Sequence, residues 1–116
     1  MIMRGPPTLS GEAGVQYSSV GQSASLACTA TAVPRVQAFT WTLDGRELGS
    51  PQGHFSLVES QAGSVMRSSL VISSVEREHF GTYRCAARNT MGEAVMEIQL
   101  RPVGEAISQS RINRYR

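Results

Sequence analysis

The sequence predicts an all-β fold in which two sheets pack face to face as a Greek-key sandwich. Short stretches alternate between apolar and polar residues at period two, and Gly, Ser and Thr separate them. Trp41 follows Cys28 by 13 residues, and Tyr83 precedes Cys85 by two. This order and these gaps are typical of a sandwich in which a tryptophan packs against two cysteines that meet between the sheets.

The length allows one domain, because 116 residues are too few for two. Residues 1–102 carry the strand-like alternation and form the predicted domain. Residues 103–116 lack it and are expected to be a linker or a flexible C-terminal tail. The sequence has no apolar leader and no apolar run of the roughly 20 residues that span a bilayer. We therefore expect a piece of a larger protein.

The first half of the chain is expected to supply edge strands, a central strand and a hairpin. Residues 1–10 contain two prolines, which cannot donate ladder hydrogen bonds and so belong at an edge, and residues 15–20 form a second edge piece. In residues 23–30, Ala24, Leu26, Cys28 and Ala30 recur at period two and predict a half-buried strand. Residues 39–43 alternate too, and the Asp-Gly pair after them is a strong turn signal that returns the chain through residues 46–48.

The second half is expected to complete both sheets. After a loop, Phe55 and Leu57 mark one strand, and a turn over residues 61–64 leads to the next. The later segments are a strand over residues 66–72, one helical turn over 76–80, a strand over 81–89, a hairpin turn over 89–92 and a last strand around 96–100 that ends at Pro102.

The alternation places a set of large side chains between the sheets. The residues expected in this structural core are Leu26, Trp41, Leu70, Ile72 and Tyr83. Cys28 and Cys85 point inward from facing sheets and fit one disulfide. An oxidised pair implies the secretory route or the cell exterior. The alternative is that both are reduced core residues of a cytosolic domain.

The sequence offers no constellation for catalysis, for a metal or for a cofactor. His54 and His79 are the only histidines, and the cysteines are assigned to each other rather than to a nucleophilic pair. No Gly-x-Ser-x-Gly or phosphate-binding Gly-x-x-x-x-Gly-Lys occurs, and the chain contains no Lys. The Cys and His spacing does not fit a zinc site. We expect a protein that is not an enzyme.

The charge distribution argues against nucleic-acid binding. The net charge is +2, yet residues 1–102 contain eight Arg and eight acidic residues. The surplus lies in residues 103–116, where three Arg face one Glu. A nucleic-acid-binding domain would carry its positive charge on the folded body.

With catalysis, metal binding and nucleic-acid binding set aside, the remaining candidate is a surface that binds another protein. The outward residues of three neighbouring strands form one exposed face with two Arg. The side chains singled out on this candidate protein-binding face are Thr40, Thr42, Arg84, Arg88 and Glu97. Arg is favoured at interfaces because its planar guanidinium makes several directed bonds. The alternative is a solvated face on which Glu97 screens an Arg, an interaction of little energy.

Several motifs together resemble the I-set branch of the immunoglobulin superfamily over about residues 6–102. They are Gly21-x-x-Ala24-x-Leu26-x-Cys28, then Trp41, then Leu70-x-Ile72-x-x-Val75, and Gly81-x-Tyr83-x-Cys85-x-Ala87-x-Asn89-x-x-Gly92. The resemblance implies an immunoglobulin-like sandwich with one disulfide. His79 stands where the family usually carries an Asp that accepts hydrogen bonds or pairs with an Arg, which puts that pairing in doubt.

The opening of the chain has a narrower resemblance. Gly5-Pro6-Pro7, Ser10, Glu12 and Val15-Gln16-Tyr17 are similar to the start of the membrane-proximal domain of Neph/Kirre (nephrin-like) cell-adhesion receptors. This resemblance implies an extracellular position in a membrane-anchored, single-pass parent. The implied partners are other cell-surface immunoglobulin-superfamily proteins, bound homophilically or heterophilically, and neighbouring domains of the same chain.

Three functions are compatible with these observations. The first is an extracellular module of an adhesion or recognition receptor that acts mainly as a rigid spacer in a multi-domain ectodomain. The second is a cytosolic, muscle-type I-set structural domain. The third is the receptor's own homophilic or ligand-binding domain.

Overall fold

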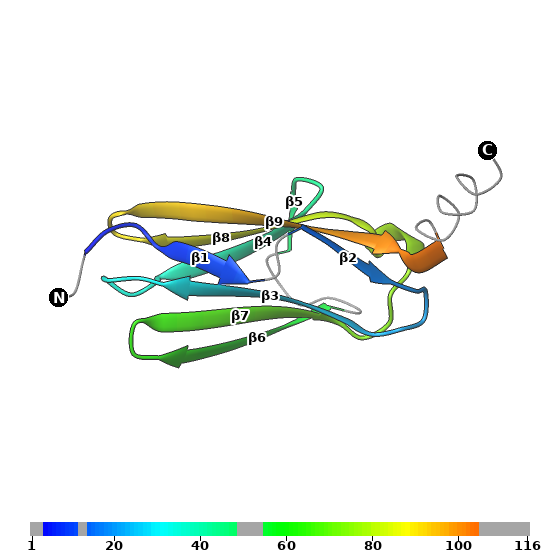
Figure 1. Ribbon diagram of the computed structural model, residues 1–116, viewed down its shortest axis with the longest axis horizontal. Helices are drawn as coiled ribbons and strands as arrows, with labels where there is room; N and C mark the ends of the chain where they lie inside the picture. The colour runs from blue at the N-terminus through cyan, green and yellow to red at the C-terminus, as the bar shows by residue number, and fades with distance from the viewer. Residues whose placement is uncertain (1–3, 12–13, 49–54, 105–116) are drawn as a thin grey trace.

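Two β-sheets pack face to face in the computed structural model, which describes residues 4–11, 14–48 and 55–104 (Figure 1). The first sheet has the strand order β1 (Thr8–Gly11), β3 (Ala24–Thr31), β7 (Val65–Ile72), β6 (Phe55–Ala62). The second has the order β2 (Gly14–Ser18), β9 (Gly92–Pro102), β8 (Gly81–Asn89), β4 (Ala38–Leu43), β5 (Arg46–Glu47). The predicted all-β, immunoglobulin-like sandwich is confirmed.

The first two strands attach the beginning of the chain to both sheets. β1 pairs antiparallel with β3, whereas β2 pairs parallel with β9 from Gly14↔Ile98 to Ser18↔Pro102. Gly11 must be glycine, because its φ is 145° and a Cβ there would lie 2.9 Å from the carbonyl oxygen of Ala27. The two edge pieces predicted from the sequence therefore belong to different sheets.

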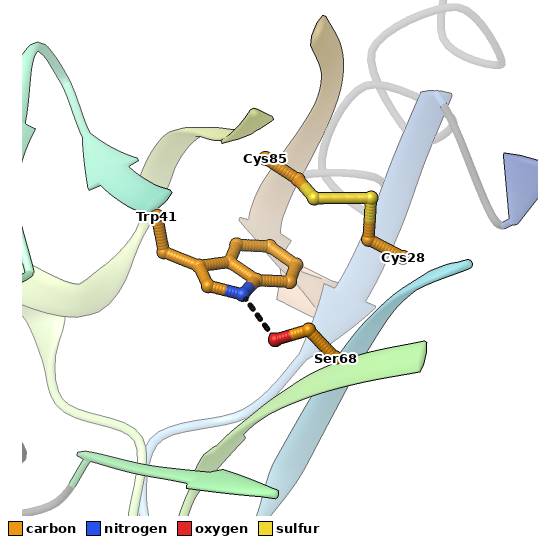
Figure 2. Close-up of a disulfide and its surroundings, with 4 residues drawn as sticks. All are labelled: Cys28, Trp41, Ser68 and Cys85. Carbon is orange, nitrogen blue, oxygen red and sulfur yellow. Dashed lines mark hydrogen bonds between the residues drawn. A yellow bond between two sulfur atoms is a disulfide. The ribbon is translucent and has the colours of Figure 1, made fainter. Parts of the chain in front are cut away.

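The core lies between the sheets around the disulfide Cys28–Cys85, whose Cα atoms are 6.6 Å apart (Figure 2). The indole of Trp41 lies beside this bridge, and its Nε1–H donates to the hydroxyl of Ser68 across the sandwich at 2.9 Å. All five residues expected in the structural core are at most 1% exposed, namely Leu26, Trp41, Leu70, Ile72 and Tyr83. Ser68 satisfies the indole N–H, so the large aromatic is buried without an unpaired donor.

Two strands are longer than the sequence pattern indicates. β6 continues to Ala62 and pairs with β7 without interruption, because Gly63, with φ 61°, and Ser64 suffice for the turn. β9 already begins at Gly92, because Gly92 pairs with Asn89 and only the two residues between them form the hairpin turn. The predicted helical turn appears as a 3-10 turn, η1 (Arg77–His79), which crosses between the sheets.

The predicted loop over residues 49–53 and nearly all of the predicted tail lie outside the described residues. Within the described part of the chain, no helix is long and apolar enough to cross a membrane.

Candidate functional site: the outer face of the second sheet

The five residues of the candidate protein-binding face project from three adjacent strands, β4, β8 and β9. The ladder places Thr42 beside Arg84 and Arg84 beside Glu97 in one row across the sheet. The same register places Thr40 and Arg88 on that side of the sheet, because paired residues share a face. The structure therefore brings together all five residues that the sequence singled out.

Arg84 and Glu97 form an ion pair in the first row of this face. Their Nη2 and Oε2 atoms are 2.7 Å apart, and the side chains are 54% and 51% exposed. Water screens an ion pair at this exposure, so the interaction contributes about 0.2–1 kcal/mol to stability. For Arg84, the structure thus agrees with the alternative of a solvated face on which Glu97 screens an arginine.

Arg88 lies in a different row of the face, and its guanidinium remains available to bind a partner. It is exposed and lies opposite Glu93 in the ladder. Its guanidinium forms no ion pair with any residue that the structure describes. Five donors on a fixed planar group are therefore directed to solvent at this end of the face.

Small side chains separate the two arginine rows. Thr40, Ala86 and Val95 align across β4, β8 and β9, and Val95 is 47% exposed. A partner protein can cover this uncharged strip between two charged rows with little desolvation cost.

Asp44 fixes the end of this face, a role that the sequence pattern did not reveal. It adopts a left-handed conformation with φ 51° in the turn between β4 and β5. Its Oδ1 accepts from the backbone N–H of Thr82 at 2.9 Å, and its own N–H donates to the carbonyl of Thr82 at 2.8 Å. A Cβ at Gly81 would lie 2.5 Å from this carboxylate, so that position needs glycine.

The corner before β8 has a different bond from the one that the family pattern suggests. Nδ1 of His79 accepts from the backbone N–H of Glu76 at 2.9 Å, and the Glu76 side chain accepts from the backbone N–H of His79. His79 thus takes part in a reciprocal cap in place of the family's Asp. The imidazole is 6% exposed and meets the ring of Phe55 edge-on, with centroids 5.0 Å apart.

Tyr83 completes the corner. Its hydroxyl donates to the carbonyl oxygen of His79. Burial raises the pKa of the Tyr83 phenol far above its usual range, and the nearby carboxylate of Asp44 raises this pKa further. Tyr83 is therefore a neutral structural group rather than a reactive one.

Asn89 connects three segments at the opposite end of the molecule, and no sequence pattern indicates these contacts. Its Nδ2 donates to the carbonyl oxygens of Gly5 and Pro34, both at 2.8 Å, and its Oδ1 accepts from the N–H of Met91 at 2.9 Å. The side chain is 3% exposed. It joins the entering chain, the loop after β3 and the hairpin after β8.

No group of three or more His, Cys, Asp or Glu side chains that could hold a metal occurs among the described residues. A hollow of about 200 Å³ lies where β8 begins and β9 ends. Its lining consists of Phe80, Gly81, Thr82, Gln99, Leu100, Arg101 and Pro102. Thr82 supplies the one side-chain hydroxyl among these described lining residues, and no His, Cys, Asp, Glu or Lys accompanies it as a base.

A family model described as an immunoglobulin domain matches residues 6–89. The chain belongs to the immunoglobulin-domain family. Among curated relatives of this immunoglobulin domain, the Irregular chiasm C-roughest protein of Drosophila melanogaster is 35% identical over 101 residues. That alignment covers 86% of this chain and 13% of the relative. The Limbic system-associated membrane protein of Rattus norvegicus is 37% identical over 87 residues, which cover 75% of this chain and 24% of the relative.

The resemblance to Neph/Kirre-type adhesion receptors is confirmed by these relatives, which also include the Synaptogenesis protein syg-1 of Caenorhabditis elegans at 29% identity over 78% of this chain and 12% of the relative. The immunoglobulin domain is thus homologous to parts of adhesion-receptor ectodomains and spans a small fraction of their length.

Solved structures agree on the fold. A complex of Dpr2 Ig1-Ig2 with DIP-Theta Ig1-Ig3 contains a chain with a TM-score of 0.80 at 24% identity, covering 86% of this chain and 33% of that chain. Titin M4 has a TM-score of 0.71 at 20% identity, covering 88% of this chain and all of that chain. At these identities the likeness concerns the fold alone.

Proposed function

We propose that this immunoglobulin domain is an extracellular module of a cell-adhesion or recognition receptor and acts mainly as a rigid spacer. The observation that carries the proposal is the path of the chain through the sandwich. The described chain enters at one end of the sandwich, and β9 leaves at the other (Figure 1). Domains joined before and after it would therefore be held apart along the length of the sandwich.

Rigidity follows from how the entering chain is attached. The N–H of Gly5 donates to the carbonyl of Val33 at 2.9 Å, and Asn89 holds the carbonyl of Gly5. β1 then joins the first sheet and β2 the second, while the disulfide joins the two sheets. A load on the entering chain is thus shared by both sheets.

Exchange of the domain within the longer receptor tests the spacer role. An immunoglobulin sandwich of equal length but unrelated surface should support adhesion in a cell-aggregation assay as well as the original does. Aggregation that falls with the exchanged domain, at equal surface expression, would contradict the spacer proposal and favour a binding role.

The extracellular position is supported by the paired cysteines and by the names of the relatives, which include a membrane protein. The alternative, a cytosolic muscle-type structural domain, has the likeness to titin in its favour, and that likeness concerns the fold alone. Thiol alkylation and mass measurement without reductant, on protein made through the secretory route, separate the two. We expect no modified cysteine, and two modified cysteines would contradict the extracellular proposal.

A second candidate function makes this domain the receptor's own homophilic or ligand-binding module, with other immunoglobulin-superfamily proteins as partners. The exposed strip around Val95 and the guanidinium of Arg88, which lacks an ion pair with any described residue, favour it. The structure similar to this chain that contains Dpr2 and DIP-Theta is itself a complex of such proteins. The double substitution Arg84→Glu and Arg88→Glu tests this face. Under the spacer proposal, receptor binding and self-association are unchanged, and loss of either supports the binding role.

A further inference from the structure

The four outermost strands of the two sheets differ in how far they expose a free edge. β1, β2 and β5 have four, five and two residues, whereas β6 has eight. β1 also follows two prolines, and β2 begins with a glycine, features that weaken an edge as a template for pairing. Among the described strands, β6 is thus the one long edge with no strand on its outer side.

Glu59, which points to the inner side of β6, is the one feature of this strand that usually protects an edge. The strand contains no Pro, Gly, Lys or Arg, and its register with β7 runs from Phe55↔Ile72 to Ala62↔Val65 without a bulge. The outward residues are Ser56, Val58, Ser60 and Ala62, all uncharged. Val58 is 57% exposed, which is high for an apolar residue on a strand.

The outer face of the first sheet is also almost free of charge. Arg67 is the charged residue among the side chains that the register of β1, β3, β6 and β7 places on this face. Glu59 is opposite Ser68 in the ladder and so lies on the inner side of β6, at the rim of the sandwich. A strand approaching the edge of β6 therefore meets little charge repulsion on the outer face.

We propose that β6 is a self-association edge, at which a second copy of this chain adds its own β6 antiparallel to extend the first sheet across both molecules. A two-fold axis at Val58 sets the register. It pairs Val58 with Val58, Ser56 with Ser60 and Leu57 with Glu59 of the second copy. The exposed apolar side chains then meet each other, and no like charges face one another.

Neighbouring registers are less favourable. A two-fold axis one residue later would place Glu59 opposite Glu59, and like charges directly opposite destabilise a strand pair. An axis one residue earlier pairs Val58 with Ser56 and leaves the exposed valines apart. The interface is narrow, so the association is weak and concentration-dependent.

Sedimentation equilibrium of the full chain at protein concentrations up to about 1 mM tests the proposal. We expect a reversible monomer–dimer equilibrium that Val58→Lys weakens by at least about tenfold, because two lysines then face each other. The matched control is Val65→Lys on β7, an exposed valine on the same face one strand inward, which should leave the dimer intact. Circular dichroism melts establish that each variant is folded.

Cysteine cross-linking tests the register. Val58→Cys should give a disulfide-linked dimer under mild oxidation, whereas Ser60→Cys should not, because that residue faces Ser56 of the second copy. A chain that stays monomeric at every concentration overturns the proposal, as does a dimer that Val58→Lys leaves unchanged.

The self-association edge uses a different surface from the candidate protein-binding face, so the two can fail separately. A dimer lost with Arg84→Glu and Arg88→Glu but retained with Val58→Lys would place self-association on the second sheet and overturn the inference about β6. Loss of the dimer with Arg84→Glu and Arg88→Glu would also favour the binding role over the spacer role, whereas the effect of Val58→Lys leaves the test of the spacer role unchanged.

Discussion

At the scale of single residues, the side chain of Asn89 stabilises the fold in a way that its residue type alone does not indicate. It makes three hydrogen bonds, to Gly5, Pro34 and Met91, which belong to three segments that meet at one end of the molecule. Asn89→Ala leaves two carbonyl oxygens and one N–H without their partner, and we expect it to lower the free energy of unfolding by about 2–4 kcal/mol. Urea denaturation measures the loss.

Asn89→Asp is the sharper variant. It keeps the acceptor for the N–H of Met91 but turns an oxygen toward the carbonyls of Gly5 and Pro34, so it should cost at least as much as Asn89→Ala. Thr90→Ala, at the exposed neighbouring position, is the control. A loss in unfolding free energy below about 0.5 kcal/mol in Asn89→Ala would contradict the stabilising role of these three hydrogen bonds.

Tyr83 predicts a pH dependence at alkaline pH. Its folded-state pKa lies above the unfolded value, so the unfolded chain loses the phenol proton first. The stabilisation is complete below about pH 10 and declines by about 1.4 kcal/mol per pH unit above it. Unfolding free energies at pH 9 to 11 should fall more steeply in the wild type than in Tyr83→Phe. Tyr17→Phe, at an exposed site, should behave like the wild type, and equal slopes for wild type and Tyr83→Phe would contradict the assignment.

The residues around the disulfide could be predicted because each has a distinctive type and a fixed spacing. Cys28, Trp41 and Tyr83 all occupy the expected places. The partners of Asn89 could not be predicted, because Gly5 and Pro34 are 84 and 55 residues away in the chain. The same holds for Ser68, whose bond to Trp41 crosses from one sheet to the other.

At the scale of elements, the turn between β4 and β5 is fixed to the start of β8 by Asp44. Asp44→Ala removes the acceptor for the Thr82 N–H and places alanine at φ 51°, and we expect a loss of about 1–3 kcal/mol. Asp44→Asn keeps an oxygen acceptor and tolerates the left-handed conformation, so it should lose less than half as much. Thermal and urea unfolding of both variants measure the difference. Equal losses would contradict the hydrogen-bonding role.

Element positions followed from the alternation, whereas element lengths did not. Ser, Gln and Ala near the end of β6 have no strong preference, and pairing with β7 decides that they are extended. The division of the opening segment between two sheets was likewise not visible, since β2 is parallel to a strand more than 80 residues later.

At the scale of the whole molecule, the disulfide restricts the unfolded chain. The two cysteines are 57 residues apart, so in the entropic model the bridge contributes about 4 kcal/mol. The double substitution Cys28→Ala and Cys85→Ala should lower the free energy of unfolding by about this amount or leave the domain largely unfolded at 37 °C. Urea denaturation at 25 °C checks it, and a loss below about 1 kcal/mol would contradict the model.

The sequence by itself determined the two-sheet sandwich, the cysteine pairing, the large core residues around the disulfide and the outward direction of Arg84 and Arg88. These follow from period-two alternation and from residue types whose burial is strongly constrained. The tertiary structure alone decided that Glu97 pairs with Arg84 rather than with Arg88, that Asn89 joins three segments, and that β6 has a long free edge. These depend on strand order and register, which bring together residues that are remote in the chain.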